Sequence, residues 1–185
     1  HDLQNAGVRT ILTACSNCMM SFRRHLEGVE IVSVYEVLAQ VGIPAEKQQA
    51  YADRAPLLLH DPCPTRNEAP VQEAIRTLAA QLGLTLGELK YNRGRTLGCG
   101  TGVMVKLAAP AIHEKHKTGR AEEGEAGMYR TYCRECATTL TQAGRPTLHL
   151  LDFLFSDGTA PEPMGLAATW LNRIRAKKMG TTRRG

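Results

Sequence analysis

Hydrophobic and polar positions along the chain predict short strands that alternate with helices. The segment Gly7–Thr13 is rich in β-branched residues, which is typical of a strand, and Glu30–Val34 has the same character. Between Glu68 and Leu82 the apolar residues recur with a helical period, and Gly83 follows at the position of a helix stop. Alternation of this kind predicts an α/β fold with mostly parallel sheets and right-handed crossovers.

One strand–helix–strand pattern occurs twice. In each copy a β-rich run leads into a C-x-x-C pair, a helical segment follows, and a second strand precedes an acidic residue. The pairs lie at 15–18 and 133–136, an offset of 118 residues, so the first copy has no counterparts of Cys63 and Cys99 within the chain. The repeat predicts two Rossmann-like halves, the first of them truncated, with sites at the strand ends.

The repeat divides the chain into three expected regions. Residues 1–45 are the C-terminal part of a first cysteine-rich repeat, and residues 46–158 are a second, complete repeat. Residues 159–185 form an amphipathic helix, expected over Gly165–Met179, and a basic tail. The missing counterparts indicate a fragment, a processed product or one piece of a longer polypeptide.

Composition and charge exclude several classes of protein. A hydrophobic fraction of 43% and a charged fraction of 22% argue against a disordered chain, a collagen-like repeat and a coiled coil. No apolar run approaches the ~20 residues of a membrane span, and no signal peptide begins the chain, so we expect a cytoplasmic protein. Of the net charge of +5, six basic residues lie in the segment Arg173–Gly185, which leaves 17 basic against 18 acidic residues elsewhere. We therefore expect no nucleic-acid partner.

Six cysteines carry the strongest chemical signal in the sequence. Without a secretory signal, an even number of cysteines favours metal binding or redox chemistry over structural disulfides. A C-x-x-C that opens a helix directs two sulfurs to one centre, and the helix N-terminus favours the thiolates. The predicted ligands of such a centre are Cys63, Cys99, Cys133 and Cys136. Four thiolates suit a [4Fe-4S] cluster or a tetrahedral zinc ion, and the alternative without a metal is a set of small buried side chains.

Three hypotheses apply to Cys15 and Cys18. They complete a second metal centre with ligands outside this chain, they form a thioredoxin-like dithiol, or they join Cys133 and Cys136 in one zinc site across the two halves. We include both residues among the candidate metal ligands.

Three residues near the cysteines are candidates for contact with a cofactor. Gly98 and Gly100 belong to a glycine-rich turn whose backbone can approach a ligand closely and whose amides favour negative charge. In the same hypothesis His60 donates a hydrogen bond to a cluster sulfur; the alternative is a strand-end histidine that pairs with Asp61 or with the backbone. No metalloprotease motif surrounds His113 and His116, which we expect to be solvated.

These motifs resemble the cysteine-rich CCG-domain family, which includes a subunit of heterodisulfide reductase and iron–sulfur subunits of glycolate and lactate oxidation systems. The family pattern is a cysteine, a Cys-Cys-Gly and a C-x-x-C at similar intervals, usually present twice. The matching segments are His60-Asp61-Pro62-Cys63 with Arg66, then Gly98-Cys99-Gly100, then Cys133-x-x-Cys136, and, for the tail of a first copy, Cys15-x-x-Cys18 with Val34-Tyr35-Glu36-Val37-Leu38. The resemblance covers residues 7–155.

The resemblance implies an iron–sulfur electron-transfer subunit, or a fragment of one, in a heterodisulfide-reductase-like or hydroxy-acid-oxidising oxidoreductase complex. The implied partners are other subunits of that complex, a flavoprotein or a membrane- or quinone-linked subunit, which would bring the protein to the inner face of the membrane. Family members hold a non-cubane cluster with five cysteines, whereas this chain has Gly98 in place of one of them and keeps four. We therefore expect a [4Fe-4S] cluster and predict no catalytic residue. The alternative, from a different class, is a zinc-stabilised binding module without redox turnover.

Overall fold

The structure is a computed structural model that describes residues 2–125, 127–158, 170–172, 174 and 175. Its strands form one sheet of two strands and one of four, and every strand pair is parallel. The predicted α/β fold with parallel sheets is confirmed. Within the described residues, no helix combines the length and the apolar character needed to cross a membrane.

The two-stranded sheet belongs to the first C-x-x-C unit, which we define as residues 10–41. Strands β1 and β2 pair in parallel with Ile11 opposite Ile31, and helix α2 crosses between them. Helix α3 follows β2 directly, and the Ser33 hydroxyl accepts a hydrogen bond from the Tyr35 amide at the helix start. The elements of this region are α1 (Asp2–Asn5), β1 (Thr10–Thr13), α2 (Ser16–His25), β2 (Glu30–Ser33), α3 (Val34–Val41) and the 3₁₀ helix η1 (Ala45–Lys47).

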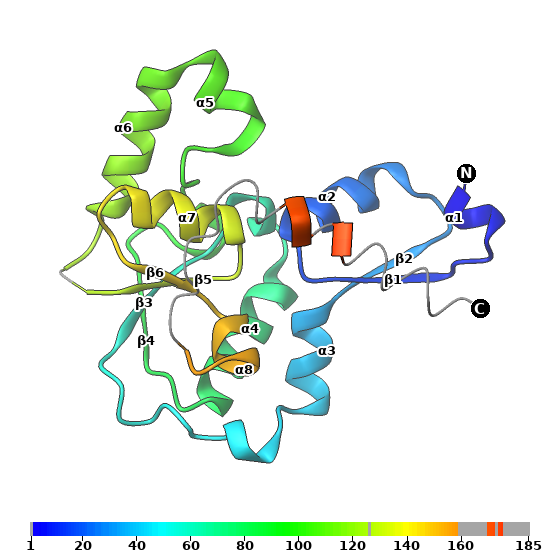
Figure 1. Cartoon of the computed structure of the whole chain (residues 1–185), viewed down its shortest axis with the longest axis horizontal. Helices are drawn as coiled ribbons and strands as arrows, with labels where there is room; N and C mark the ends of the chain where they lie inside the picture. Colours follow the sequence, from blue (N-terminus) through cyan, green and yellow to red (C-terminus); the bar gives the residue numbers. More distant parts are fainter. Residues whose placement is uncertain (1, 126, 159–169, 173, 176–185) are drawn as a thin grey trace.

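The four-stranded sheet has the order β4-β3-β5-β6 (Figure 1). Helix α4 connects β3 to β4, α7 connects β5 to β6, and α6 packs against α7. The second C-x-x-C unit, defined as residues 129–155, supplies the β5 and β6 side of this sheet. The elements are β3 (Leu57–His60), η2 (Cys63–Thr65), α4 (Ala69–Gln81), β4 (Leu86–Glu88), η3 (Arg93–Arg95), η4 (Gly102–Met104), α5 (Val105–Ala108), α6 (Pro110–Ala121), β5 (Tyr129–Thr131), α7 (Arg134–Gln142), β6 (Thr147–His149) and α8 (Leu151–Phe155).

The two C-x-x-C units have the same order of elements, since β1–α2–β2–α3 corresponds to β5–α7–β6–α8. The first cysteine of each pair, Cys15 or Cys133, is the N-cap residue of the following helix. Gly28 and Gly144 lie in the turn after that helix with φ angles of 71° and 85°, a conformation that favours glycine. The repeat in the sequence is therefore also a repeat in the structure.

The main hydrophobic core joins the first unit to the four-stranded sheet. Helix α3 packs against α4, and Ile75, Leu78 and Leu82 of the same core are fully buried. Tyr35 of the first unit is 1% exposed and belongs to the same cluster of buried side chains. Burial of one Leu or Ile side chain stabilises a fold by about 1.5–3 kcal/mol, so this core holds the two sheets together.

The outer edge of β6 is covered by side chains. The Thr147 amide donates to Thr141 Oγ1 at 3.1 Å, and the His149 amide donates to Asp152 Oδ2 at 3.0 Å. The acceptor Thr141 belongs to α7, which precedes β6 in the chain, and the acceptor Asp152 belongs to α8, which follows it. An edge whose outward amides are satisfied in this way is protected from pairing with a further strand.

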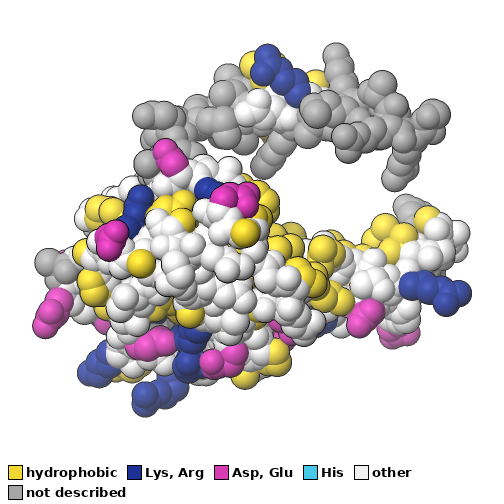
Figure 2. All heavy atoms as spheres, turned by 90° about the horizontal axis from the view of Figure 1, so that it is seen from below, with side chains coloured by type: hydrophobic (Ala, Val, Ile, Leu, Met, Phe, Trp, Pro, Cys, Tyr) yellow, Lys and Arg dark blue, Asp and Glu magenta, His cyan; other side chains and the backbone are white. Residues whose placement is uncertain are grey.

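The described surface carries charges of both signs. On the face shown in Figure 2, Lys and Arg side chains are interspersed with Asp and Glu side chains. Most of the predicted helix over Gly165–Met179, and the whole end of the basic tail, lie outside the described residues. Both therefore stay predictions.

Candidate metal centre

Four cysteines gather near the carboxyl ends of two neighbouring strands. Cys63 follows β3 and begins η2, and Cys133 follows β5 after one intervening residue, Tyr132. Cys136 lies in the first turn of α7, and Cys99 lies in the glycine-rich loop before η4. Because β3 and β5 are parallel neighbours, their carboxyl ends meet at the same edge of the sheet.

The four thiols interact with one another. The side chain of Cys136 interacts with those of Cys133 and Cys99, and Cys63 lies within electrostatic range of Cys99 and Cys133. Cys99 and Cys136 are 4% and 3% exposed, and the other two are half-buried. We call these four residues the four-cysteine cluster. They come from three segments that are distant in the sequence.

Interactions within the cluster change the acidity of its members. The side chain of Cys136 lowers the pKa of Cys99 to about 6, although burial acts in the opposite direction. The same partner lowers the pKa of Cys133. Cys133 and Cys99, followed by burial, raise the pKa of Cys136 well above the ordinary value. Burial, followed by Cys99, raises the pKa of Cys63. Two of the four side chains are thus prepared to become thiolates, the form that binds soft metals.

Two threonines hold the side chain of Cys99 in place. The Cys99 thiol donates to Thr101 Oγ1 at 3.6 Å, and Thr101 Oγ1 lies 2.8 Å from Thr139 Oγ1 of α7. This chain of hydroxyl contacts ties the glycine-rich loop to the helix that carries Cys136. Sequence analysis did not identify either threonine.

The glycines of the loop have two different functions. A Cβ atom on Gly98 would lie 3.4 Å from Cys63 Sγ, so the loop backbone passes directly beside a cluster thiol. Gly100 has φ of 87°, and a Cβ there would lie 3.0 Å from the backbone oxygen of His113 in α6. The close approach at Gly98 is therefore to the cluster, whereas the close approach at Gly100 is to a helix of the same chain.

The environment of His113 differs from the prediction. The residue is 4% exposed, and its Nδ1 lies 3.0 Å from the Gly100 carbonyl oxygen. The expectation of a solvated histidine is wrong because α6 packs onto the glycine-rich loop. No sequence pattern in the helix indicates this contact.

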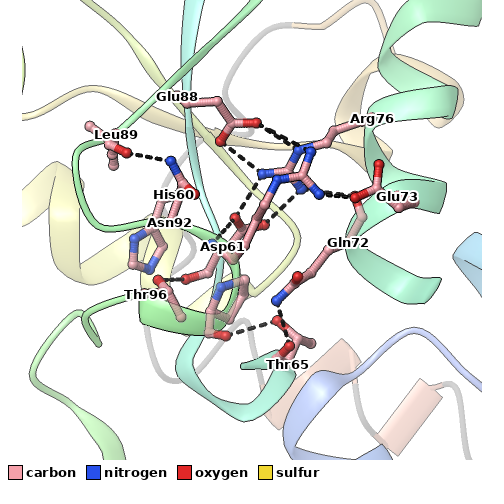
Figure 3. A network of polar contacts seen from close by, with 12 residues as sticks. His60, Asp61, Thr65, Gln72, Glu73, Arg76, Glu88, Leu89, Asn92 and Thr96 are labelled. Atoms are coloured by element: carbon pink, nitrogen blue, oxygen red, sulfur yellow. Dashed lines mark hydrogen bonds and ion pairs between the residues drawn. The ribbon is translucent and has the colours of Figure 1, made fainter. Parts of the chain in front are cut away.

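Asp61 holds the ends of the two central strands in place (Figure 3). Its side chain is fully buried and accepts hydrogen bonds from Arg76 at 2.9 and 3.3 Å, from the Arg93 amide at 2.9 Å and from the Tyr132 hydroxyl at 2.9 Å. Burial acts to raise the pKa of Asp61, but Arg76 and the Arg93 amide outweigh it, and the pKa is lowered. Asp61 stands two residues before Cys63 and Tyr132 stands immediately before the second C-x-x-C, so this buried anion sets the spacing of the cluster.

His60 is fully buried and does not pair with Asp61 in the way that one alternative predicted. Its Nδ1 lies 2.9 Å from Nε of Arg120, a donor in α6 that sequence analysis missed. Burial, followed by the charge of Arg120, lowers the pKa of His60 to about 3, so the ring is neutral. Among the described residues, His60 Nε2 and the nearby Thr131 Oγ1 have no hydrogen-bond partner.

The first C-x-x-C pair has a different environment. Cys15 is exposed, Cys18 is half-buried, and Cys15 Sγ accepts a hydrogen bond from the Cys18 amide at 3.3 Å. The Cys15 side chain raises the pKa of Cys18. The hydroxyl of Tyr35 lies between the two units, because it donates to the carbonyls of Ala14 at 3.2 Å and Tyr132 at 3.4 Å.

Within residues 2–125 and 127–158 and the short described C-terminal segments, no group of three or more His, Cys, Asp or Glu side chains is spaced to hold a metal ion. The donor chemistry of the four-cysteine cluster nevertheless fits an iron–sulfur group, since its members are thiols alone. The buried polar atoms without a partner among the described residues include His60 Nε2 and Thr131 Oγ1, which lie at the same end of the sheet. Hydrogen-bond donors around a sulfur-ligated centre are the usual surroundings of such a group.

Neither a scan against protein-family models nor a search of the curated proteins finds a match to this chain. The resemblance to the cysteine-rich CCG-domain family therefore stays a prediction.

Proposed function

We propose that this chain is an iron–sulfur electron-transfer unit in which the four-cysteine cluster binds a [4Fe-4S] group. One observation carries the proposal: thiols from three distant segments interact at one end of a parallel sheet. A cubane cluster takes four cysteine thiolates, and this is the number that Cys63, Cys99, Cys133 and Cys136 supply. The lowered pKa values of Cys99 and Cys133 support the same proposal, because ligand thiols bind as thiolates.

Each part of the chain has a defined task in this proposal. When bound, the cluster supplies one-electron redox chemistry. The burial of Cys99 and Cys136 keeps water from two of the ligands. Thr101 orients Cys99, and the buried Asp61 keeps the β3 and β5 ends at a constant separation. Rigid support of this kind lowers the reorganisation that accompanies electron transfer.

The resemblance supplies the wider context of the proposal. It favours a place in a heterodisulfide-reductase-like or hydroxy-acid-oxidising complex, with a flavoprotein or a membrane- or quinone-linked subunit as the partner. The exposed Cys15 and the half-buried Cys18 then belong to a second centre whose remaining ligands come from another polypeptide.

A zinc-stabilised binding module without redox turnover is the competing function, since four thiolates also suit zinc. Anaerobic purification of the full chain, followed by counts of iron, acid-labile sulfide and zinc, separates the two. We expect a brown protein with about four iron and four sulfide per chain. A colourless protein with about one zinc per chain would overturn the proposal.

The variant Gly98→Cys tests the number of ligands. Position 98 lies beside Cys63, so the variant places a fifth thiol next to the four-cysteine cluster. We expect the electron paramagnetic resonance spectrum of the wild-type chain to be that of a cubane cluster and that of Gly98→Cys to differ from it. A wild-type spectrum that already shows a non-cubane cluster would contradict the assignment of four ligands.

A further inference from the structure

We infer that Arg120 makes His60 a hydrogen-bond donor through Nε2, and that His60 and Thr131 direct two donors toward the sulfur atoms of the four-cysteine cluster. The first half of this inference concerns the chain alone. The second half rests on the proposed iron–sulfur function and assigns the residues that set the reduction potential of that site.

The contact between Arg120 and His60 determines which ring nitrogen carries the proton. A guanidinium group has donors only, so the 2.9 Å contact from Arg120 Nε requires an acceptor lone pair on His60 Nδ1. A neutral imidazole carries one proton, which must then reside on Nε2. His60 is 0% exposed, so neither nitrogen faces bulk solvent.

Arg120 is itself held in a single orientation. It is 1% exposed, forms an ion pair with Glu123 through Nη1, and donates to Thr96 Oγ1 at 3.5 Å through Nη2. Its backbone carbonyl also accepts a hydrogen bond from the Tyr129 hydroxyl at 3.2 Å. These contacts leave Nε directed at His60. Arg120 therefore acts as a positioning residue, because its Nε atom contacts His60.

The two donors lie side by side on one face of the sheet. His60 and Thr131 are the last residues of β3 and β5, and they are register partners. Leu58 and Tyr129, two positions earlier on the same strands, pack with Cys99 and Cys136 in one cluster of buried side chains. Since alternate residues of a strand share a face, His60 and Thr131 face the thiols too.

Both donors lack a partner among the described residues. A buried donor that makes no hydrogen bond destabilises a fold by about 1–3 kcal/mol, so two such groups at neighbouring positions require an explanation. An electron-rich sulfur at the end of the sheet satisfies both. Donors to cluster sulfurs stabilise the reduced, more negative state and so raise the reduction potential.

Nitrogen NMR of the full chain, purified without added iron, tests the first half. We expect the His60 ring to show a proton on Nε2 and none on Nδ1, and we expect Arg120→Met to remove this preference. A proton on Nδ1 in the wild-type chain would overturn the assignment. This measurement requires no cluster.

Redox titration of the iron-loaded chain tests the second half. We expect lower reduction potentials in His60→Leu and in Thr131→Val, with iron and sulfide content unchanged. In His60→Gln, which keeps an N–H donor, we expect a reduction potential between those of His60→Leu and the wild-type chain. The matched control is Thr13→Val, since Thr13 ends β1 as Thr131 ends β5. An unchanged potential in both variants would overturn the donor assignment. A chain that binds no iron would overturn the proposed function and the donor role together, while the NMR result still decides the Arg120–His60 assignment.

Discussion

The two C-x-x-C units place the same motif in different surroundings. In both, the first cysteine caps a helix that follows a parallel strand. In the second unit Cys136 is 3% exposed and interacts with two other thiols, whereas Cys15 in the first unit is exposed and interacts with the thiol of Cys18. The motif alone therefore brings two sulfurs together, and the neighbouring segments supply burial and the other two sulfurs.

The strands that precede the motifs explain this difference. β5 has β3 on one side and β6 on the other, whereas in the described part of the chain β1 pairs with β2 alone. Leu12 in β1 is 56% exposed, while all three residues of β5 are buried. The strand β3 also brings Cys63 and Asp61, for which the first unit has no counterpart within the described residues. A complete site thus depends on a second strand beside the first.

The largest expected difference between the units is in cluster binding. We expect Cys136→Ser to abolish the bound iron and the visible absorbance, because it removes one of the four proposed ligands. The same replacement at the matching position, Cys18→Ser, is expected to leave both unchanged. Iron and sulfide analysis of the two anaerobically purified variants provides the comparison. Equal loss in both variants would show that the units share one centre.

The second largest expected difference between the units is the pH at which their thiols ionise. In the chain without metal, Cys99 loses its proton at about pH 6, because Cys136 lowers its pKa. The pKa of Cys99 is lower in the folded state than in the unfolded state. The Cys99 thiolate therefore stabilises the fold to its full extent above the ordinary thiol pKa, and this stabilisation is lost as the pH falls through about 6. Ultraviolet absorbance of thiolates and urea unfolding over this range measure both effects.

The control variants for this titration come from the two units. Cys99→Ser is expected to remove the ionisation near pH 6, and Cys15→Ser is expected to keep it. If Cys15→Ser removed it instead, the acidic thiol would belong to the first unit.

Removal of the buried anion is expected to have a large effect on stability. Asp61→Ala leaves Arg76 and the Tyr132 hydroxyl without their partner, and loss of one member of a buried ion pair lowers the free energy of unfolding by about 3–5 kcal/mol. The control, Glu114→Gln, changes a carboxylate that is 61% exposed and is expected to have no measurable effect. Urea unfolding compares the two. Equal midpoints would contradict a structural role for Asp61.

The link between the units is expected to contribute less. Tyr35→Phe removes the hydroxyl that donates to the carbonyls before both motifs, which should lower the free energy of unfolding by about 1 kcal/mol. We expect faster amide exchange in residues 10–41 than in residues 129–155. Tyr91→Phe, at a tyrosine that is 37% exposed, is the control. Uniform acceleration of exchange in both units would contradict a linking role.

The smallest expected effect is at the surface of β1. Leu12→Ser should change the free energy of unfolding by no more than about 0.5 kcal/mol, because the side chain is 56% exposed. Leu59→Ala, at a β3 leucine that is 2% exposed, should lower it by about 2–5 kcal/mol. Comparable losses in both variants would indicate that β1 is covered in solution.

Much of the fold was predictable from local patterns. Helix α4 matches the apolar period between Glu68 and Leu82, and both C-x-x-C pairs lie between a strand and a helix as their context predicted. The parallel sheets also followed from the alternation of strands and helices. The buried position of His113 was missed, since α6 looks polar in sequence and its packing depends on the distant glycine-rich loop.

The sequence by itself determined the repeat, the class of fold and the identity of the candidate ligands. Short-range periodicity and turn residues encode these features, and they act over a few positions along the chain. Only the tertiary structure decided that Arg120 meets His60, that Asp61 joins the ends of β3 and β5, and that Cys15 stays exposed. These outcomes depend on contacts between residues far apart in sequence, and such contacts are decided by how whole helices and strands pack.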